Sequence, residues 1–309
     1  MNGGLYLADH SPYFGGYRPQ RDSTLLSLVG VPFDSTSSFR PGQRFAPREI
    51  RRASMYIEFN SLRTGIDFES VGVYDEGDVA VVHGDAGETI ARVADVVSGI
   101  VEEGRVPILL GGEHTITLGA LRALRKRRPC VLWVDAHMDL REEYLGLRLG
   151  HASVLRRALE EGSAKSAFIL GARGFSRDEE EWARVSGVNV VTSREVENSS
   201  IARLSLMIKK WLVGAGCGGL YVSIDMDVFD PCYAPGVGNP EPEGLVPGVV
   251  FDVLAEVVSD DLLGFDVVEV SPPFDPSGIT SVLAAKTVVE IGGMWWRARW
   301  RGRPSYRVS

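Results

Sequence analysis

The sequence predicts an α/β protein in which helices cover both faces of a doubly wound, mainly parallel β-sheet. Short runs rich in Val, Ile and Leu alternate along the chain with longer amphipathic segments. This alternation is typical of buried parallel strands connected by helices. The 309 residues, 44% of them hydrophobic, contain no internal repeat, low-complexity tract or linker-like stretch. We therefore expect residues 1–309 to form a single domain with three layers, α/β/α.

Strands and helices are assigned in order from hydrophobic periodicity. Continuous apolar runs, which indicate strands covered on both faces, occur at 25–31, 106–110, 130–134, 167–170, 189–191, 220–224 and 263–270. Apolar residues at helical spacing predict helices at 88–104, 115–127, 152–161, 201–213, 246–258 and 281–291. Gly104 and Gly214 stand where helices should end, and Thr280 is suited to cap the last one.

Composition excludes several classes of protein. The net charge is −8, from 41 acidic and 33 basic residues, which disfavours a nucleic-acid partner and is compatible with a cationic small molecule. The basic run at 122–128 falls at the end of a helical pattern, where cations are favoured. No uncharged run reaches the ~18 residues that span a bilayer, and no secretory signal is visible at the N-terminus. We expect a cytoplasmic protein without a membrane partner.

The cysteines point to the same compartment. Cys130, Cys217 and Cys232 are odd in number, far apart and never in a CxxC pair. This pattern favours a reducing compartment, and it argues against both a disulfide framework and a cysteine zinc site.

Unusual polar clusters follow three of the expected strands. The run at 106–110 leads into Gly-Gly-Glu-His with His114, the run at 130–134 into Asp135, His137 and Asp139, and the run at 220–224 into Asp225 and Asp227. Parallel sheets place ligand sites beyond the carboxyl ends of their strands. In an extended segment, residues i, i+2 and i+4 share a face, so the members of each cluster point the same way. The pattern predicts that these six side chains converge.

Convergence of four carboxylates requires compensating charge. Uncompensated buried charge is costly, and two divalent cations would balance four aspartates. Oxygen and imidazole ligands without thiolate suit manganese, although zinc, cobalt or nickel could also bind. Two close metals can turn a shared water into a nucleophile near neutral pH. A lone DxD pair often caps a turn, but three clusters at successive strand ends favour metal binding.

With these residues assembled, the sequence resembles the ureohydrolase superfamily, which includes arginases, agmatinases, guanidinobutyrases and formiminoglutamases. The resemblance covers most of the chain and looks closest to prokaryotic-type agmatinases. Its motifs are FRPGQRFAPREIRRAS (39–54), GGEHTITLG (111–119), VDAHMDL (134–140) and SIDMDVFDPCYAPGVGNPEPEGL (223–245). The resemblance implies an arginase-like α/β/α fold and a hydrolase with two Mn²⁺ per subunit, which cleaves a guanidino compound to urea and an amine.

The resemblance also implies roles for individual residues. One metal would be bound by His114, Asp135, Asp139 and Asp225, and the other by His137, Asp135, Asp225 and Asp227. The proton-shuttle histidine falls on His151 and the guanidinium-binding glutamate on Glu269. Both roles make physical sense, because a leaving amine needs a proton and a buried carboxylate can bind a planar guanidinium through two charge-assisted hydrogen bonds. Without the resemblance, a surface residue at a helix start would be the expectation for His151, and a structural arginine partner is the alternative for Glu269.

Agmatine is the substrate that we expect, with hydrolysis to putrescine and urea. Arginases have an asparagine two residues after the DAHxD motif, where this chain has Arg141. Glu142 and Glu143 could attract a distal ammonium group, or could simply be solvated. Arg141 could instead pair with the carboxylate of guanidinobutyrate or another guanidino acid. Arginase or formiminoglutamase activity, a catalytically inactive metal-binding relative and a single-metal deacetylase are further alternatives.

Other polar residues receive minor roles. His10 and His83 are expected on the surface or in loops, and Asp230 is expected to orient the loop that carries Asp225 and Asp227. The aromatic and basic stretch at 295–309 could contact another subunit or form a tail. Relatives commonly form trimers or hexamers, so the resemblance implies a homo-oligomer.

Overall fold

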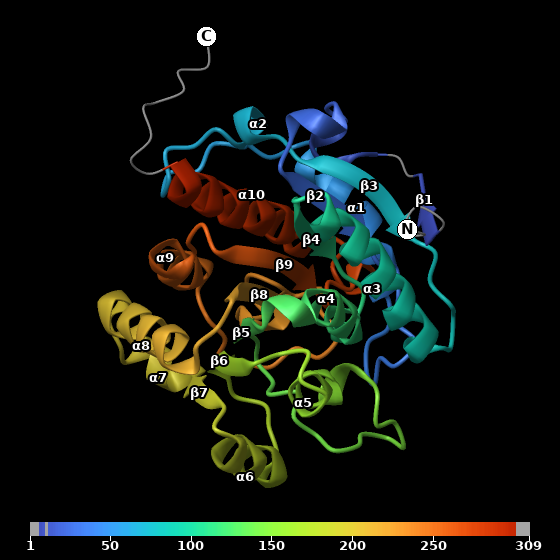
Figure 1. The fold of residues 1–309 in the computed structure, drawn as a ribbon. Helices are drawn as coiled ribbons and strands as arrows, with labels where there is room; N and C mark the ends of the chain where they lie inside the picture. Colours follow the sequence, from blue (N-terminus) through green and yellow to red (C-terminus); the bar gives the residue numbers. More distant parts are fainter. Residues whose placement is uncertain (1–5, 10–11, 301–309) are drawn as a thin grey trace.

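A computed structural model describes residues 6–9 and 12–300. The described residues form a nine-stranded sheet (Figure 1) with strands β1 (Leu7–Ala8), β2 (Leu26–Gly30), β3 (Tyr74–Val79), β4 (Val106–Leu110), β5 (Pro129–Val134), β6 (Ser166–Ala172), β7 (Asn189–Thr192), β8 (Gly219–Asp225) and β9 (Leu262–Val268). They lie side by side in the order β1-β3-β2-β4-β9-β8-β5-β6-β7. Every neighbouring pair is parallel except β1 with β3. The predicted fold class is confirmed.

Helices cover both faces of the sheet. They are α1 (Ala46–Ser54), α2 (Phe68–Val71), α3 (Ala86–Glu102), α4 (Thr117–Leu124), α5 (Val154–Glu160), α6 (Arg177–Ser186), α7 (Ser193–Glu197), α8 (Ile201–Ala215), α9 (Pro247–Val257) and α10 (Ile279–Trp300). Helices α8, α9 and α10 contribute to the core on one face, and α3, α4 and α5 to the core on the other (Figure 1). Among the described residues, no helix is both long and apolar enough to cross a bilayer.

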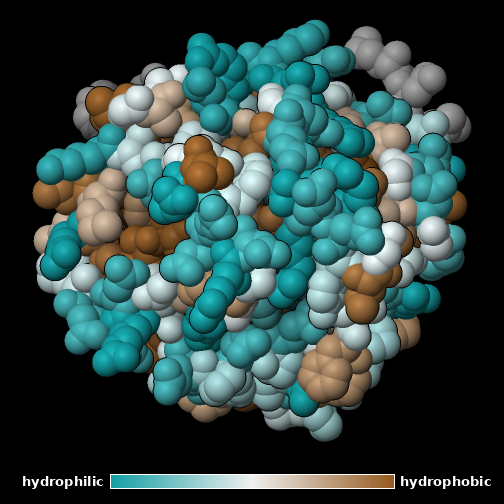
Figure 2. All heavy atoms as spheres, turned by 90° about the horizontal axis from the view of Figure 1, so that it is seen from below, coloured by the Kyte–Doolittle hydropathy of each residue, from teal (hydrophilic) through white to brown (hydrophobic). Residues whose placement is uncertain are grey.

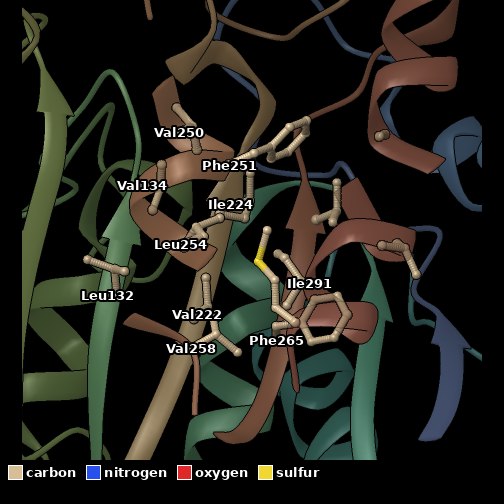
Figure 3. Packing of buried hydrophobic residues seen from close by; sticks show 14 of the residues in the cluster. Leu132, Val134, Val222, Ile224, Val250, Phe251, Leu254, Val258, Phe265 and Ile291 are labelled. Carbon is tan, nitrogen blue, oxygen red and sulfur yellow. The ribbon is translucent and has the colours of Figure 1, made fainter. Parts of the chain in front are cut away.

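Alternate residues of each central strand supply the two cores. Leu132 and Val134 of β5 belong to the core beneath α9, whereas Val131 and Trp133 belong to the opposite core. Figure 3 shows Leu132 and Val134 beside side chains of β8 and α9. Because both faces are covered, the strand residues are apolar almost without interruption. On the outer face drawn in Figure 2, hydrophilic residues predominate and hydrophobic residues form small separate groups.

Several boundaries differ from the sequence prediction. Helix α8 continues past Gly214 to Ala215, and its C-cap is Gly216, which adopts a left-handed φ of 62°. Thr280 lies inside α10 rather than capping it, and its backbone N–H donates to Asp275. Strand β9 ends at Val268, two residues earlier than expected. Strands β1 and β3 and helices α1, α2, α6 and α7 were not predicted.

The cysteine expectation was wrong for one pair. Cys130 and Cys217 are disulfide-bonded, with their Cα atoms 5.5 Å apart, and Cys232 is free and exposed. Strands β5 and β8 are neighbours in the sheet, and Cys130 is in register with Leu220. The connection just before β8 therefore brings Cys217 next to Cys130, despite a separation of 87 residues in sequence. Because the order of the strands brings these two cysteines together, their spacing in the sequence does not predict the disulfide.

The minor expectations have mixed outcomes. His83 is exposed in the loop after β3, as predicted, whereas His10 lies outside the described residues. The basic run at 122–128 spans the end of α4 and the 3₁₀ turn that follows it, as predicted. Trp295 is buried on α10, and Trp296 contacts Trp300 on the same helix. Residues 301–309 of the aromatic and basic stretch lie outside the described residues.

Candidate metal centre and active site

Four adjacent strands at the centre of the sheet, β4, β9, β8 and β5, end at the same edge. Residues 111–114 continue from β4, residues 135–139 from β5, and Glu269 directly follows β9. The backbone pairing extends past the strands, because Gly112 N donates to Val31 O and Glu269 N donates to Gly112 O. A Cβ at Gly112 would collide with the backbone of Phe33, so this close approach requires glycine. The topology thus brings the predicted clusters together.

The first group of side chains surrounds His114. Its Nδ1 atom lies 3.2 Å from Asp135 Oδ2, 3.3 Å from Asp139 Oδ2 and 3.1 Å from Asp225 Oδ2. All four residues are buried. Asp139 adopts a positive φ of 53°, a conformation that aspartate tolerates better than most residues, and this turn directs its carboxylate back toward His114.

The second group surrounds His137. Its Nδ1 atom lies 3.0 Å from Asp227 Oδ2 and 3.5 Å from Asp135 Oδ1. Asp135 is therefore shared between the two groups. Two further carboxylate oxygens accept from the backbone: Asp225 Oδ1 from Asp227 N, and Asp227 Oδ1 from Ala136 N. The structure thus brings together all six side chains that the sequence singled out.

The donor set fits a pair of divalent cations. His114 Nδ1 and Asp135 Oδ2 are buried and have no hydrogen-bond partner among the described residues, an arrangement that is costly unless a cation occupies the space between them. Burial raises the pKa of Asp139 to about 7 and that of Asp225 well above its usual range, and in both cases a neighbouring aspartate adds to the shift. Burial would lower the pKa of His114, but the surrounding aspartates raise it well above its ordinary value. Carboxylates crowded in this way are stabilised by positive charge.

A layer of residues behind His114 fixes its orientation. His114 Nε2 lies 2.8 Å from Ser223 Oγ, and Ser223 Oγ donates to the buried carboxylate of Asp266 at 2.6 Å. Tyr221 and Thr117 also donate to Asp266. The Trp133 ring stacks on the imidazole with a centroid distance of 3.8 Å. These contacts leave Nδ1 directed at the cluster, which is how a carboxylate behind a histidine orients a metal ligand.

A second supporting group lies beside His137. Arg173 donates to the backbone carbonyls of Asp227, Val228 and Glu241, among others, and so fastens the segment after β8 to residues 241–242. The Glu241 carboxylate lies 3.7 Å from His137 Nε2. Asp230 accepts from Cys232 N and Gly244 N, so it stabilises the turn that follows the aspartates, as expected. Sequence reasoning did not single out Arg173 or Glu241.

His151 begins the 3₁₀ turn before α5 and is 8% exposed at the cavity. Its Nε2 atom lies 3.1 Å from Ser38 Oγ, and its Nδ1 atom lies 3.4 Å from Thr36 Oγ1. Burial lowers the pKa of His151 to about 4, and the charge of His137 contributes in the same direction. The imidazole is therefore neutral at pH 7.

Glu269 lies beside the cluster with a positive φ of 67°. Its Oε1 atom accepts from His114 N at 2.7 Å, and its Oε2 atom accepts from Gln43 Nε2 at 2.8 Å. Burial, together with the nearby Glu113 carboxylate, raises the pKa of Glu269 to about 8. No arginine or lysine of the described residues forms an ion pair with it. The alternative expectation, that a structural arginine pairs with Glu269, is therefore wrong for the described residues.

One cavity of about 500 Å³ is lined by five of the six cluster residues and by the two expected catalytic residues, namely His114, His137, Asp139, Asp225, Asp227, His151 and Glu269. Arg141, Tyr144, Glu179 and Glu241 also line it. The Arg141 guanidinium lies over the Tyr144 ring and forms a long ion pair of 3.6 Å with Glu179. Glu142, by contrast, pairs with Arg148 and Arg156, and neither Glu142 nor Glu143 lines the cavity.

An open α/β sheet with carboxylates and imidazoles gathered at its carboxyl edge defines a metal-dependent enzyme class. Residues 25–293 match the model of the arginase family. A guanidinobutyrase of Pseudomonas aeruginosa is 36% identical, with 87% of this chain and 86% of that protein aligned. An agmatinase of Bacillus anthracis is 32% identical, with 88% and 92% aligned. The crystal structure of agmatine ureohydrolase from Thermoplasma volcanium has a TM-score of 0.82 at 35% identity and covers 96% of both chains.

The chain belongs to the arginase family, as the sequence resemblance predicted. It is a hydrolase of the amidinohydrolase class. The family is dependent on a binuclear metal centre, which agrees with the two overlapping groups of ligand atoms around Asp135.

Proposed function

We propose that this protein hydrolyses small guanidino compounds to urea and an amine with two Mn²⁺ ions per subunit, and that agmatine is its principal substrate. The observation that carries the proposal is the pair of buried, unpartnered ligand atoms, His114 Nδ1 and Asp135 Oδ2, with His114 lining the same cavity as Glu269. His114, Asp135, Asp139 and Asp225 would hold one ion, and His137, Asp135, Asp225 and Asp227 the other. When bound, such a pair of ions lowers the pKa of water and makes it a nucleophile at neutral pH.

Glu269 would bind and orient the guanidinium group. Its carboxyl is buried and its pKa is raised to about 8, so a cationic partner would favour the ionised form and form charge-assisted hydrogen bonds with it. These contacts would hold the guanidinium carbon over the cluster, where water attacks it. Orientation of this kind is a main source of rate enhancement in enzymes.

His151 would carry the proton that the reaction has to move. Attack of water on the guanidinium carbon forms a C–O bond and releases a proton, and cleavage of the C–N bond leaves an amine that takes one up. A neutral imidazole can accept the first proton and deliver it to the departing nitrogen. The low pKa of His151 supports this order, because the ring begins the cycle without the proton.

Guanidinobutyrate or another guanidino acid is the second candidate substrate. The Arg141 guanidinium lines the cavity and is held only by a long, 3.6 Å ion pair with Glu179, and a substrate carboxylate could also pair with it. The Glu241 carboxylate, 38% exposed at the same cavity, instead suits the ammonium group of agmatine. The names of the relatives support both substrates, since they include a guanidinobutyrase and an agmatinase.

A product assay on the Mn²⁺-loaded protein tests the proposal. We expect urea from agmatine, with a smaller kcat/KM for guanidinobutyrate and for arginine; formiminoglutamate would release formamide instead. Bound metal is counted on the same sample. Two ions per chain with urea release support the proposal, one ion favours a deacetylase-like enzyme, and two ions without turnover of any guanidino compound favour an inactive relative.

Three further properties belong to the same proposal. We expect a homo-oligomer, a trimer or a hexamer, which light scattering would measure. We expect one domain, which would unfold in a single calorimetric transition. A cytoplasmic location would be tested by fractionating the cells that make the protein.

A further inference from the structure

The hydroxyl of Thr36 lies between His151 and a buried carboxylate. Thr36 belongs to the segment after β2, which the sequence did not connect with catalysis. Its Oγ1 atom lies 2.5 Å from Glu113 Oε1 and 3.4 Å from His151 Nδ1, and it also accepts from the backbone N–H of His151 at 3.2 Å. The side chain thus joins the predicted proton carrier to the Glu of the Gly-Gly-Glu-His motif.

Glu113 acts as an acceptor toward all of its neighbours. It is fully buried, and it accepts from Thr36 N at 2.8 Å and from Thr115 Oγ1 at 2.6 Å, in addition to Thr36 Oγ1. Ser37 Oγ approaches the same carboxylate at 3.5 Å. Thr36 Oγ1 is the donor in its short contact with Glu113 Oε1, so the single hydroxyl proton of Thr36 points to Glu113.

The direction of the Thr36 hydroxyl proton determines which nitrogen of His151 carries a hydrogen. A threonine hydroxyl has one proton to donate, and its lone pairs can only accept. With the proton committed to Glu113, a hydrogen bond between Thr36 Oγ1 and His151 Nδ1 requires that Nδ1 carries a hydrogen. A neutral imidazole has only one N–H group, so Nε2 carries the lone pair and accepts from Ser38 Oγ at 3.1 Å. Nε2 is the atom near Ser38, which lines the cavity.

We propose that Thr36, anchored on Glu113, is a positioning residue that holds neutral His151 as the Nδ1–H tautomer and presents the Nε2 lone pair to the reaction. The inference rests on the proposed function, in which His151 accepts and delivers the proton. Nε2 is then the atom that takes the proton from the attacking water. The arrangement orients a histidine through a carboxylate, with a hydroxyl inserted between the two groups.

Kinetics of the Mn²⁺-loaded enzyme test the proposal. Thr36→Val removes the hydroxyl at nearly constant shape, and we expect kcat for agmatine to fall by about tenfold to a hundredfold, because general acid–base catalysis contributes typically 10²–10⁴-fold. KM and metal content should stay unchanged, and Thr36→Ser should recover most of kcat. Thr89→Val, a buried threonine on α3, is the matched control and should keep full activity. A Thr36→Val enzyme within threefold of wild type, or a Thr36→Ser enzyme as slow as it, would overturn the proposal.

A spectroscopic measurement tests the tautomer without relying on turnover. The chain has five histidines, so ¹⁵N-histidine labelling of the zinc-loaded protein gives a small set of ring resonances, and His151→Asn identifies its own. We expect the Nδ1–H form in the wild type and a mixture in Thr36→Val; an Nε2–H wild type refutes the inference. If no guanidino compound releases urea, the proposed function fails, and the tautomer still decides the inference separately.

Discussion

The imidazole of His137 contacts Asp227 and Asp135 through one nitrogen and approaches Glu241 with the other. Of the two groups of ligand atoms, only the second contains His137. A substitution here should therefore remove one cation and leave the other site intact.

His137→Ala is expected to bind one metal ion per chain instead of two and to lose most of its activity while remaining folded. Asp227→Ala should behave in the same way. Metal analysis after dialysis against a fixed free Mn²⁺ concentration measures the change. His83→Ala, on an exposed loop, serves as the control with full metal content, and a His137→Ala protein with two bound ions would contradict the ligand assignment.

Ser223 links the Asp266 carboxylate to His114 through two hydrogen bonds. In Ser223→Ala, the Nε2 proton of His114 and the Asp266 carboxylate both lose a partner, and the ring is less firmly oriented. We expect metal affinity to fall by about 10–100-fold, the typical effect of removing such a supporting contact. Titration with Mn²⁺ gives the affinity, and Ser205→Ala on α8, another buried serine, should leave it unchanged. Equal affinities for the two variants would exclude this role for Ser223.

Glu269→Gln tests the substrate-binding role. The amide keeps the shape and can still accept from His114 N, but it carries no negative charge. Because losing one partner of a buried charge pair costs roughly 2–5 kcal/mol, kcat/KM for guanidino substrates should fall by about 10²-fold or more with both metal ions retained. Glu243→Gln, at an exposed turn, is the control. Near-normal turnover by Glu269→Gln would remove Glu269 from substrate binding.

The sequence predicted the residues of the cluster but not the residues that support it. Asp135 and Asp225 each stand at the end of an apolar run. The end of a strand can be recognised from its own segment of the sequence, so these residues could be predicted. Trp133, Ser223 and Asp266 lie inside strands, where a tryptophan or serine has no local signature of function. Their role arises because β5, β8 and β9 are neighbours around His114, and strand order cannot be deduced from periodicity.

At the scale of elements, the acidic residues of β3 prevented its prediction as a strand. Strand β3 has the sequence YDEGDV, and its acidic residues gave no apolar run. Asp75 and Asp78 are nevertheless buried because Arg51, fully buried on α1, contacts both at 2.8 and 2.6 Å. The partner that makes this strand possible lies on another element, so a local pattern could not predict it.

Helix α6 was missed for a related reason. Its sequence, RDEEEWARVS, is charged and offers few apolar positions. A local signal was present, however, because Ser176 and Glu179 form a capping box, and the pattern of serine followed three residues later by glutamate marks a helix start. Capping residues were therefore more informative here than hydrophobic periodicity.

Capping also gives a testable prediction for α10. Asp275 accepts from the backbone N–H groups of Ser277, Gly278 and Thr280 at the start of this helix. Burial would raise the pKa of Asp275, but the hydrogen bond from the Ser277 hydroxyl, followed by those from Thr280 and Gly278, lowers it overall. A lowered pKa means that the stabilisation is fully present above the unfolded value near 4 and is lost as the pH falls through the folded value.

Asp275→Asn should lower the free energy of unfolding by about 1 kcal/mol at pH 7, as expected for a helix cap. The difference from wild type should shrink below about pH 4, where the unfolded carboxyl becomes protonated. Urea unfolding at several pH values measures it, with the exposed Asp260→Asn as control. A difference that is independent of pH would show that the charge of Asp275 is not involved.

At the scale of the whole molecule, the sheet order both creates the site and joins distant parts of the chain. The order β4-β9-β8-β5 places four strand ends side by side, although β9 follows β4 by more than a hundred residues. The same adjacency of β5 and β8 forms the Cys130–Cys217 disulfide. This bond closes the segment that contains β6, β7 and the helices between β5 and β8.

Reduction of this disulfide should destabilise the fold without affecting the cluster. Closing a loop with a sequence separation of 87 residues restricts the unfolded chain, and the chain-entropy model gives about 4–5 kcal/mol, with measured values more typically 2–4. The free energy of unfolding of wild type should therefore fall by about 2–4 kcal/mol in a strong reductant. Cys217→Ser should show the lower stability with or without reductant, and Cys232→Ser should respond like wild type because Cys232 is unpaired. A wild type that is insensitive to reductant, with three titratable thiols in the unfolded protein, would mean that the cysteines are reduced in the protein as isolated.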